Sequence, residues 1–495
     1  MDFFSNIATG FSVIADPVNL LFCFVGVLLG TVIGVLPGLG PGATISLLLP
    51  LAYHLDPVVS IIMIAGIYYG AKYGGSTTAI LLNIPGEADS VAACLDGYQM
   101  ALQGRAGPAL GIAAFGSFIA GTFATLGLML LAPALARFAL GFGPPEIFSL
   151  MVLALVLITF MSAGSQVKGL AMAALGLFLG SIGLDIFSNV GRFVFGYNFL
   201  FEGLGIVPVI VGLFGIGEVL SNLEIQAKGE IFQKRVSNLL PTLKDWKHSF
   251  WPIIRGTFIG FFVGLIPGGG GIASTFASYT VEKRISKHPE KFGKGAIEGV
   301  AGPESANNAC SGANFIPLLT LGIPTNGIMA IIFASLIING LTPGPNLIQD
   351  QPVLFWGVIA SMYVGNVMLV ILNLPLIGLW VRFLTISYSV LAPLILFFCL
   401  LGSYTLKNAV PDLIIMLIFG ILGFLMKKLR YEGAPLIMGF VISELVEGAF
   451  IRSLLMSRGS FSIFFTRPIS CVLMIVAVIL FVVPFFGKKP KAVGD

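Results

Sequence analysis

The chain has 495 residues, of which 57% are hydrophobic and only 10% are charged, and its formal net charge is +4. Soluble domains carry about 25% charged residues, so a soluble protein could not keep this much apolar surface from water, whereas a bilayer accepts it. The five cysteines form no CxxC pair and the three histidines lie far apart, which argues against a His-rich metal site or a His-based catalytic triad.

The N-terminal region contains no Lys or Arg before Lys72. A cleaved signal peptide begins with a basic segment. The first apolar stretch, 18–36, is therefore expected to be a retained membrane segment.

Further along the chain, apolar stretches alternate between long and broken ones. Several reach the ~20 residues that a helix needs to cross a bilayer. Backbone polar groups inside lipid must be satisfied by the protein, so broken segments have to be covered or line a cavity. We therefore predict an all-α polytopic membrane protein with re-entrant hairpins and broken transmembrane helices. The shorter stretches, broken by Gly and Pro, are 43–55, 58–71, 74–84, 252–266 and 272–281.

Two segments of the chain resemble each other at an offset of 230 residues. Residues 34–40 read Gly-Val-Leu-Pro-Gly-Leu-Gly, and residues 264–270 read Gly-Leu-Ile-Pro-Gly-Gly-Gly. Phe-Glu-Gly at 201–203 and Tyr-Glu-Gly at 431–433 keep the same offset. An ordered series of this kind predicts a duplicated chain, and paired broken segments in two halves are the best sequence indication of a transporter's binding site.

The duplication suggests how the chain is divided. The polar, basic stretch between the halves is interpreted as cytoplasmic, because basic loops stay inside. The predicted parts are a first transmembrane repeat (1–222), a cytoplasmic linker (223–255), a second transmembrane repeat (256–467) and a C-terminal transmembrane helix with its tail (468–495).

The flanking charges of the two halves differ. Residues 1–71 contain no Lys or Arg, whereas 256–282 lies between Arg255 and a basic run at 283–294. The second hairpin is therefore expected to enter from the cytoplasm and the first from outside, as in inverted-topology repeats. Arg452, Arg458 and Arg467 would then face outward, against the tendency of basic residues to stay on the cytoplasmic side.

The first candidate site is the pair of glycine-rich loops. Glycine lets backbone N–H groups approach a ligand, and a helix that begins after such a loop presents its positive end to an anion. The alternative is a tight hairpin tip or close helix packing. The residues expected to bind substrate here are Gly38, Gly40, Gly42, Thr44, Gly268, Gly269, Gly270 and Ser274.

The second candidate site is formed by two prolines inside apolar runs. Proline removes a backbone donor and frees a carbonyl, and freed carbonyls with Asn and Thr side chains can coordinate Na⁺. The alternative is an ordinary proline kink. The residues expected to couple an ion are Asn83, Pro85, Gly322 and Pro324, with Thr325 and Asn326 as substrate ligands.

The third candidate site is a polar run of small residues before the apolar stretch at 315. Asn307, Ser311 and Asn314 share a helix face and Asn308 adjoins it, a pattern that suits a wet cavity. Lys72, in the matching region of the first half, could be the counter-ion of an anionic substrate, and its alternative is snorkelling to the interface. Glu304 could cap a helix or couple an ion.

These motifs resemble the TctA family, the large membrane subunits of bacterial tripartite tricarboxylate transporters. The resemblance is carried by Gly34 to Thr44 followed by Leu-Leu-Leu-Pro at 47–50, by Tyr69 to Ser76, and by Pro303 to Ala309 running to Leu-Gly-Ile-Pro-Thr at 321–325. The second loop departs from it by lacking an equivalent of Pro41. The resemblance implies a multi-pass subunit in the bacterial inner membrane that works with a small membrane subunit (TctB-like) and a periplasmic solute-binding protein (TctC-like).

The family implies secondary transport driven by an ion gradient, with citrate-like tricarboxylates or other small organic acids as substrates. We therefore expect carboxylate uptake by symport, with no cofactor other than the coupling ion. Na⁺ is favoured over H⁺, because the loops are rich in carbonyls and poor in buried carboxylates. The alternatives are an anion channel and a membrane-embedded enzyme, although no enzyme constellation is recognisable.

Overall fold

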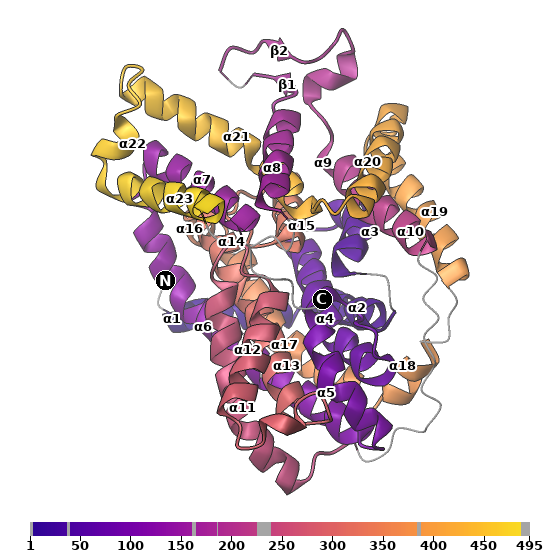
Figure 1. Ribbon diagram of the computed structural model, residues 1–495. Helices are drawn as coiled ribbons and strands as arrows, with labels where there is room; N and C mark the ends of the chain where they lie inside the picture. Colours follow the sequence, from indigo (N-terminus) through magenta and orange to yellow (C-terminus); the bar gives the residue numbers. More distant parts are fainter. Residues whose placement is uncertain are drawn as a thin grey trace. The chain divides into compact units, whose positions relative to one another are not determined.

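The computed structural model describes residues 3–36, 40–160, 165–185, 187–224, 239–383 and 388–486. Helices make up almost all of its regular structure (Figure 1), which confirms the all-α prediction. The chain forms two compact units, and each is built from segments that are distant in sequence. Unit 1 contains residues 1–137 and 205–425, and unit 2 contains residues 138–204 and 426–495.

Unit 1 holds every candidate site residue. Short helices and broken helices alternate in it with long ones. Its elements are α1 (Phe3–Ile14), α2 (Pro17–Val35), α3 (Pro41–Tyr53), α4 (Pro57–Leu82), η1 (Ala88–Ser90), α5 (Val91–Leu102), α6 (Ala106–Ala139), α9 (Ile206–Ile210), η3 (Val211–Ile216), α10 (Gly217–Glu224), α11 (Leu243–Gly264), α12 (Gly271–Ile285), η4 (Pro289–Lys291), α13 (Glu298–Ala313), α14 (Phe315–Leu321), α15 (Gly327–Ile338), α16 (Leu347–Asp350), α17 (Pro352–Asn373), α18 (Ile377–Phe383), α19 (Tyr388–Lys407) and α20 (Val410–Lys428).

Unit 2 consists of α7 (Pro144–Phe160), α8 (Gln166–Gly180), β1 (Gly183–Leu184), β2 (Gly191–Arg192), η2 (Asn198–Glu202), α21 (Gly433–Met456), α22 (Ile463–Thr466) and α23 (Pro468–Phe486). The two short strands are antiparallel, with Gly183 opposite Arg192, a small departure from an all-helical chain. Arg192 is held by Glu447 of α21 at 2.5 Å and by Asp185 at 3.3 Å. These ion pairs fix the strand pair to the helices.

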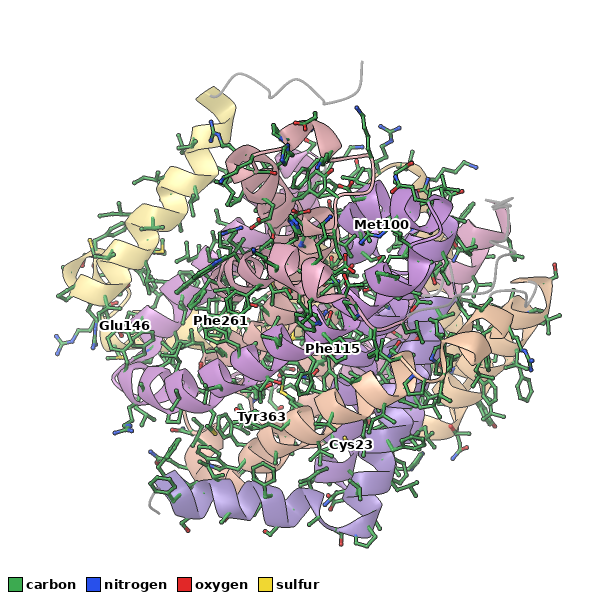
Figure 2. The ribbon with its side chains drawn as sticks, turned by 90° about the horizontal axis from the view of Figure 1, so that it is seen from below. Cys23, Met100, Phe115, Glu146, Phe261 and Tyr363 are labelled. Carbon is green, nitrogen blue, oxygen red and sulfur yellow. The ribbon has the colours of Figure 1, made fainter. Side chains whose placement is uncertain are left out.

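Within the described ranges, eight helical stretches are long and apolar enough to cross a membrane. They are α2, α4, α6, the continuous run from Ile206 to Leu223, α17, α19, α20 and α21. α4 is almost entirely buried inside the protein, so protein surrounds this span on all sides. Fully buried side chains such as Cys23 of α2 and Met100 of α5 lie among the helices of unit 1 (Figure 2).

Glycines let α2 and α4 pack at backbone contact. A methyl group added at Gly26 would lie 2.4 Å from the carbonyl oxygen of Met63, and one at Gly30 would lie 2.5 Å from that of Ile67. Carbon and oxygen cannot approach so closely, so a side chain would force the helices apart. This spacing of small residues is the usual means of close packing between membrane helices.

α11 and α13 are packed in the same way. Methyl groups at Gly256 and Gly260 would lie 2.2 Å and 2.1 Å from the carbonyl oxygens of Gly302 and Ala306. These two glycines are the positions that sequence comparison pairs with Gly26 and Gly30. The shared construction agrees with a duplicated chain, and the division at 222, 255 and 467 stays a prediction.

The predicted linker 223–255 is only partly described. Residues 225–238 lie outside the described ranges, and Leu243 to Arg255 form the first part of α11. Thr242 begins this helix with a capping box, in which Thr242 and Asp245 each accept a hydrogen bond from the backbone of the other. α11 and α12 then pack side by side (Figure 1), as expected of a hairpin.

Candidate functional site

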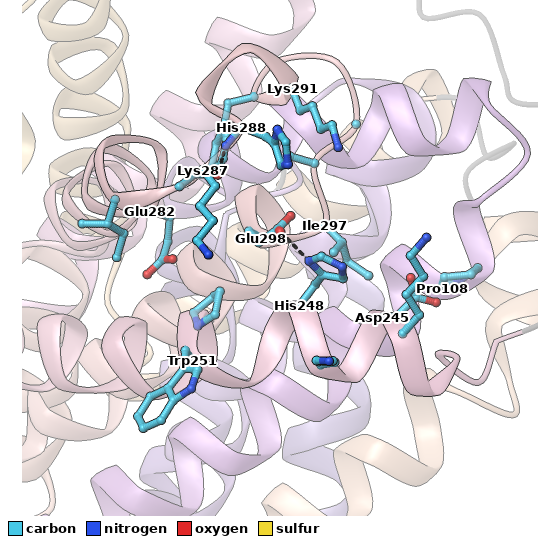
Figure 3. Close-up of a pocket in the computed structure, with 18 of the residues that line it drawn as sticks. Pro108, Asp245, His248, Trp251, Glu282, Lys287, His288, Lys291, Ile297 and Glu298 are labelled. Atoms are coloured by element: carbon cyan, nitrogen blue, oxygen red, sulfur yellow. Dashed lines mark hydrogen bonds and ion pairs between the residues drawn. The ribbon is translucent and has the colours of Figure 1, made fainter.

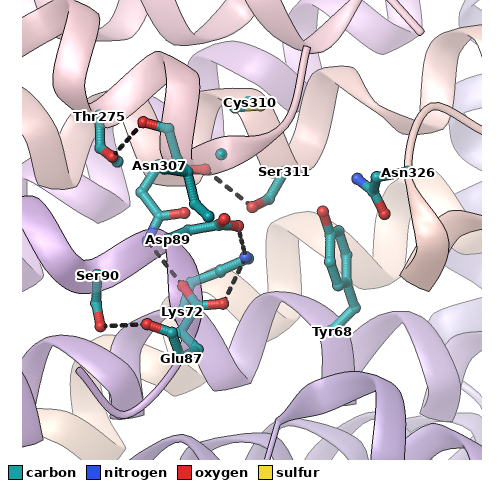
Figure 4. Close-up of polar contacts among 12 residues, drawn as sticks. Tyr68, Lys72, Glu87, Asp89, Ser90, Thr275, Asn307, Cys310, Ser311 and Asn326 are labelled. Carbon is teal, nitrogen blue, oxygen red and sulfur yellow. Dashed lines mark hydrogen bonds and ion pairs between the residues drawn. The ribbon is translucent and has the colours of Figure 1, made fainter. Parts of the chain in front are cut away.

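The centre of the site is Lys72, in the middle of α4, whose side chain is completely buried. Its Nζ lies 2.6 Å from Glu87 Oε2, also forms an ion pair with Asp89, and stands 5.2 Å from the centre of the Tyr68 ring (Figure 4). A buried charge is tolerated only when it is paired. The snorkelling alternative is therefore wrong for Lys72, because its ammonium group points into the protein.

A chain reversal after α4 brings both carboxylates to Lys72. Asn83 ends the helix in the left-handed conformation, at φ 57°, a common way to stop a helix. Gly86 then passes the end of α2, where a methyl group would lie 1.9 Å from the carbonyl oxygen of Gly34, so no other residue fits. Pro85 thus follows a helix end and does not kink a continuous helix, so the proline-kink alternative is wrong here.

Glu87 and Asp89 differ in how firmly they are held. Glu87 is buried, with 2% of its side chain exposed, and its second oxygen accepts a 2.9 Å hydrogen bond from Asn307 Nδ2. The Asp89 side chain is 18% exposed, and it lies in the short helix η1. Glu87 is therefore a built-in partner of Lys72, whereas Asp89 has solvent on one side.

Asp89 also lies against the second glycine loop. α12 begins at Gly271, with Gly270 as its N-cap, and a methyl group added to Gly271 would lie 2.2 Å from Asp89 Oδ2. The first turn of a helix carries unpaired N–H groups and the positive end of the helix dipole. A carboxylate of the chain thus lies beside the helix end at which the sequence predicts an anion.

The second glycine loop is hydrogen-bonded to the segment 322–326, which contains the predicted proline break of the second half. The backbone N–H of Gly268 donates to the carbonyl oxygen of Thr325 at 2.7 Å. Gly322 ends α14 at φ 68°, so Pro324 also follows a helix end, and Asn326 caps α15 by accepting from the N–H of Met329 at 3.0 Å. The segment 322–326 is therefore a break between two helices, bound to the glycine loop.

The first glycine loop meets this break from another side. Residues 37–39, including the predicted ligand Gly38, lie outside the described ranges. α3 begins after Gly40, and Thr44 donates back to the Gly40 carbonyl at 3.2 Å. A methyl group at Gly42 would contact the side chains of Ile328 and Ile331 at 3.6 Å. The starts of α3 and α15 thus touch, so both loops adjoin the same break.

The polar face of α13 packs against protein rather than an open cavity. Asn314 donates to the Tyr68 hydroxyl at 2.9 Å, and Ser311 donates to the Asn307 carbonyl at 2.9 Å. Asn308 points elsewhere, to Ser117 of α6 at 2.7 Å. The expectation of a wet face is wrong for this structure, because these side chains are buried.

Three of the predicted ligands have oxygens without a donor. Asn307 Oδ1, Asn314 Oδ1 and Thr325 Oγ1 are buried and accept no hydrogen bond from any described residue. Ser274, by contrast, is satisfied by the carbonyl of Gly271 at 2.8 Å. Buried polar groups are normally satisfied, so these oxygens are the acceptors that the site leaves open.

Glu304 lies inside α13 and is 1% exposed. It accepts a hydrogen bond from Ser76 of α4, so its predicted role as a helix cap is wrong. Glu87 and Asp89 are carboxylates that the sequence analysis missed, and together with Glu304 they contradict the expectation that the site is poor in buried carboxylates. An acidic pair directly after the Pro85-Gly86 break was the available signal, in a chain with only 23 acidic residues.

Comparison with known proteins agrees with this architecture. The family model described as the tripartite tricarboxylate transporter TctA family matches residues 20–438. An Agrobacterium vitis protein described as an uncharacterized 52.8 kDa protein in the TAR-I ttuC' 3' region is 52% identical over 492 residues, 99% of this chain and 98% of that protein. A second A. vitis protein, described as an uncharacterized protein in the TAR-II ttuC' 3' region, is 51% identical over 233 residues, 46% of this chain and 96% of that protein.

No solved structure matches the chain significantly. The family model covers most of the chain, from within α2 to within α21, including the Lys72 cluster (Lys72, Glu87, Asp89 and Asn307). The family is one of transporters and not of enzymes. This multi-pass membrane protein therefore belongs to the TctA family of the tripartite tricarboxylate transporters.

Proposed function

We propose that the protein is the translocating subunit for ion-driven uptake of a tricarboxylate or another small organic carboxylate across the bacterial inner membrane. It would work with a small membrane subunit and a periplasmic solute-binding protein, as the family's tripartite character suggests. The observation that carries the proposal is the Lys72–Asp89 ion pair beside the amino end of α12. A cation and a helix end converge there on one carboxylate.

In this proposal Asp89 holds the place of a substrate carboxylate. Removing the partner of a buried charge costs roughly 3–5 kcal/mol, so Lys72 needs an anion at every stage of transport. Glu87 supplies one anion throughout, and Asp89 supplies a second one in the empty site and gives way when a substrate carboxylate arrives. Glu87 stays in place, because Asn307 and Lys72 hold its two oxygens.

The backbone around this point suits the exchange. Asp89 lies on a three-residue helix between the break at 83–86 and the start of α5, and it is partly exposed, so a small rotation can move its carboxylate toward solvent. The substrate would then gain Lys72 and the N–H groups of the first turn of α12, which are typical ligands of a carboxylate. A second carboxylate of the same substrate would lie near the break at 322–326.

For the coupling ion we propose Na⁺. The support is the set of buried oxygens without donors on Asn307, Asn314 and Thr325, because hard cations prefer such neutral oxygen ligands. H⁺ is the second candidate, favoured by Glu304, a buried carboxylate without an ion pair to any described residue. In Glu304→Gln, Na⁺-driven uptake is expected to persist, whereas a proton carrier would lose its response to a pH gradient.

The function is tested in proteoliposomes that contain the chain and the small membrane subunit. Labelled citrate and the solute-binding protein are added to the solution outside the vesicles. An inward Na⁺ gradient is expected to drive accumulation above the equilibrium level, and an Na⁺ ionophore should abolish it. Uptake that only equilibrates citrate, with or without the gradient, would identify an anion channel. Accumulation that follows a pH gradient alone would leave carboxylate uptake standing and overturn Na⁺ coupling.

We also propose that the two hairpins enter the membrane from opposite sides. The support is the absence of Lys and Arg before Lys72 and the basic residues on both flanks of 256–282. The matching packing of α2 on α4 and α11 on α13 supports the duplication that inverted repeats require, and the charge difference supports the inversion.

A further inference from the structure

A second basic site lies away from Lys72, in a cavity of about 860 Å³ (Figure 3). Its walls come from α11, the end of α12, the loop that follows and the start of α6. The volume corresponds to roughly 30 waters of the bulk liquid, so the cavity has room for far more than a single ion.

The cavity carries an excess of positive charge. Six Lys or Arg side chains line it, against three carboxylates. Arg105 pairs with Asp245, Arg255 pairs with Glu282 at 2.6 Å, and Glu298 contacts His248 at 3.1 Å. Each carboxylate in the lining is therefore already engaged. The four lysines that form no ion pair with a described residue are Lys244, Lys247, Lys287 and Lys291.

Asp245 is the engaged carboxylate that pairs with Arg105. Burial raises the pKa of Asp245, but hydrogen bonds from Thr242 and the neighbouring Arg105 lower it by more, so the pKa lies below its usual range. Asp245 therefore remains an anion that neutralises Arg105 and does not free it. The unbalanced charge of the cavity belongs to the four lysines.

An apolar strip leads away from the cavity along α11. Trp251 lines the cavity and is 61% exposed, and Phe258 and Phe262 follow it on the same helix face, 46% and 60% exposed. Large apolar side chains exposed in a row on a membrane protein face acyl chains. Trp is typical of the level where lipid headgroups meet the hydrocarbon region.

We propose that this cavity binds the phosphate headgroup of an anionic phospholipid, with the acyl chains along Trp251, Phe258 and Phe262. The four lysines attract the phosphate, and the strip selects a lipid over a soluble anion. Basic pockets between membrane helices are known to hold such headgroups. The lipid would bind the base of the α11–α12 hairpin, whose tip carries Gly268 and Gly271.

The test compares two double variants of the full-length protein in detergent. Lys287→Gln/Lys291→Gln removes two charges from the cavity lining. Lys283→Gln/Arg284→Gln removes two charges from the same end of α12 that do not line the cavity. Native mass spectrometry with added phosphatidylglycerol, cardiolipin and phosphatidylcholine measures how much lipid each protein retains.

Retention of the anionic lipids is expected to fall about fivefold for each lysine lost from the lining, and to stay unchanged in the control variant. Phosphatidylcholine should bind weakly to all three proteins. Trp251→Ala should weaken lipid retention without changing the charge. The proposal is overturned by equal retention in both double variants, or by inorganic phosphate that displaces the lipid at millimolar concentration. If the Lys287→Gln/Lys291→Gln variant retains lipid unchanged but no longer co-purifies with a partner subunit, the cavity is a protein interface and not a lipid site.

Discussion

The carboxylate of Asp89 occupies the space that any side chain at Gly271 would need. A methyl group at Gly271 would lie 2.2 Å from Asp89 Oδ2, yet these residues come from opposite halves of the chain. The carboxylate simultaneously pairs with Lys72. Each of the three groups can be changed separately, which makes the proposed exchange of Asp89 for a substrate carboxylate testable.

Asp89→Asn is expected to bind a carboxylate substrate about tenfold more tightly, a difference of about 1.4 kcal/mol. The neutral amide no longer competes for Lys72, and Glu87 still balances the charge. Binding of citrate to the purified protein, measured by calorimetry, checks this. Asp56→Asn is the matched control, because Asp56 caps the start of the same α4 and is exposed. Unchanged or weaker binding in Asp89→Asn would remove Asp89 from the mechanism while leaving carboxylate uptake open.

Glu87→Gln is expected to lower the free energy of unfolding by roughly 3–5 kcal/mol, because it takes a buried partner from Lys72. Asp89→Asn should be much less damaging, since that side chain is partly exposed. Thermal unfolding of the two variants in the same detergent gives the comparison. Equal loss of stability would mean that both carboxylates are structural.

Gly271→Ala is expected to abolish uptake, whereas Gly270→Ala should retain most of it. The methyl group of the first would collide with Asp89, but no atom lies within 4 Å of a methyl group at Gly270. The two variants differ by one position in one loop, so general disturbance of the loop affects both. Initial uptake rates in proteoliposomes measure the difference, and equal rates would show that the contact has no functional part.

Asn307→Ala is expected to abolish uptake while the protein still inserts and folds. It removes the hydrogen bond that holds Glu87 and one of the unpartnered oxygens. Asn308→Ala is the comparison, because Asn308 faces Ser117 and not the Lys72 cluster. Uptake per folded transporter should fall at least a hundredfold in the first variant and less than threefold in the second, about 2.7 against 0.6 kcal/mol. Similar losses in both would count against a special role for Asn307.

Cysteines at His54 and Lys294 are expected to be labelled from opposite sides of the membrane. His54 follows the first hairpin and Lys294 follows the second, and both are exposed. Intact cells are treated with a membrane-impermeant maleimide, in a background with Cys94 and Cys471 replaced. Inverted repeats require labelling at His54Cys from outside and at Lys294Cys only after lysis. Labelling of both from one side would rule out the inverted topology.

Composition and local pattern were sufficient to predict the membrane class and the helix breaks at Asn83-Ile84-Pro85 and Gly322-Ile323-Pro324, and they named Lys72 as a candidate counter-ion, a role that stays a prediction. A bilayer responds to the average polarity of a segment, and Pro and Gly act on the backbone next to them. These effects need no knowledge of distant residues, so they can be read from neighbouring letters of the sequence.

Only the tertiary structure decided what surrounds Lys72. The reversal at Gly86 brings Glu87 and Asp89 back onto α4, and the packing of α13 turns Asn307 toward Glu87. The tertiary structure likewise decided that residues 1–137 and 205–425 form one compact unit, which includes segments from both sides of the predicted linker 223–255. Buried charges interact over a few ångströms, and those distances depend on how separate helices pack, which the order of residues in one segment does not determine.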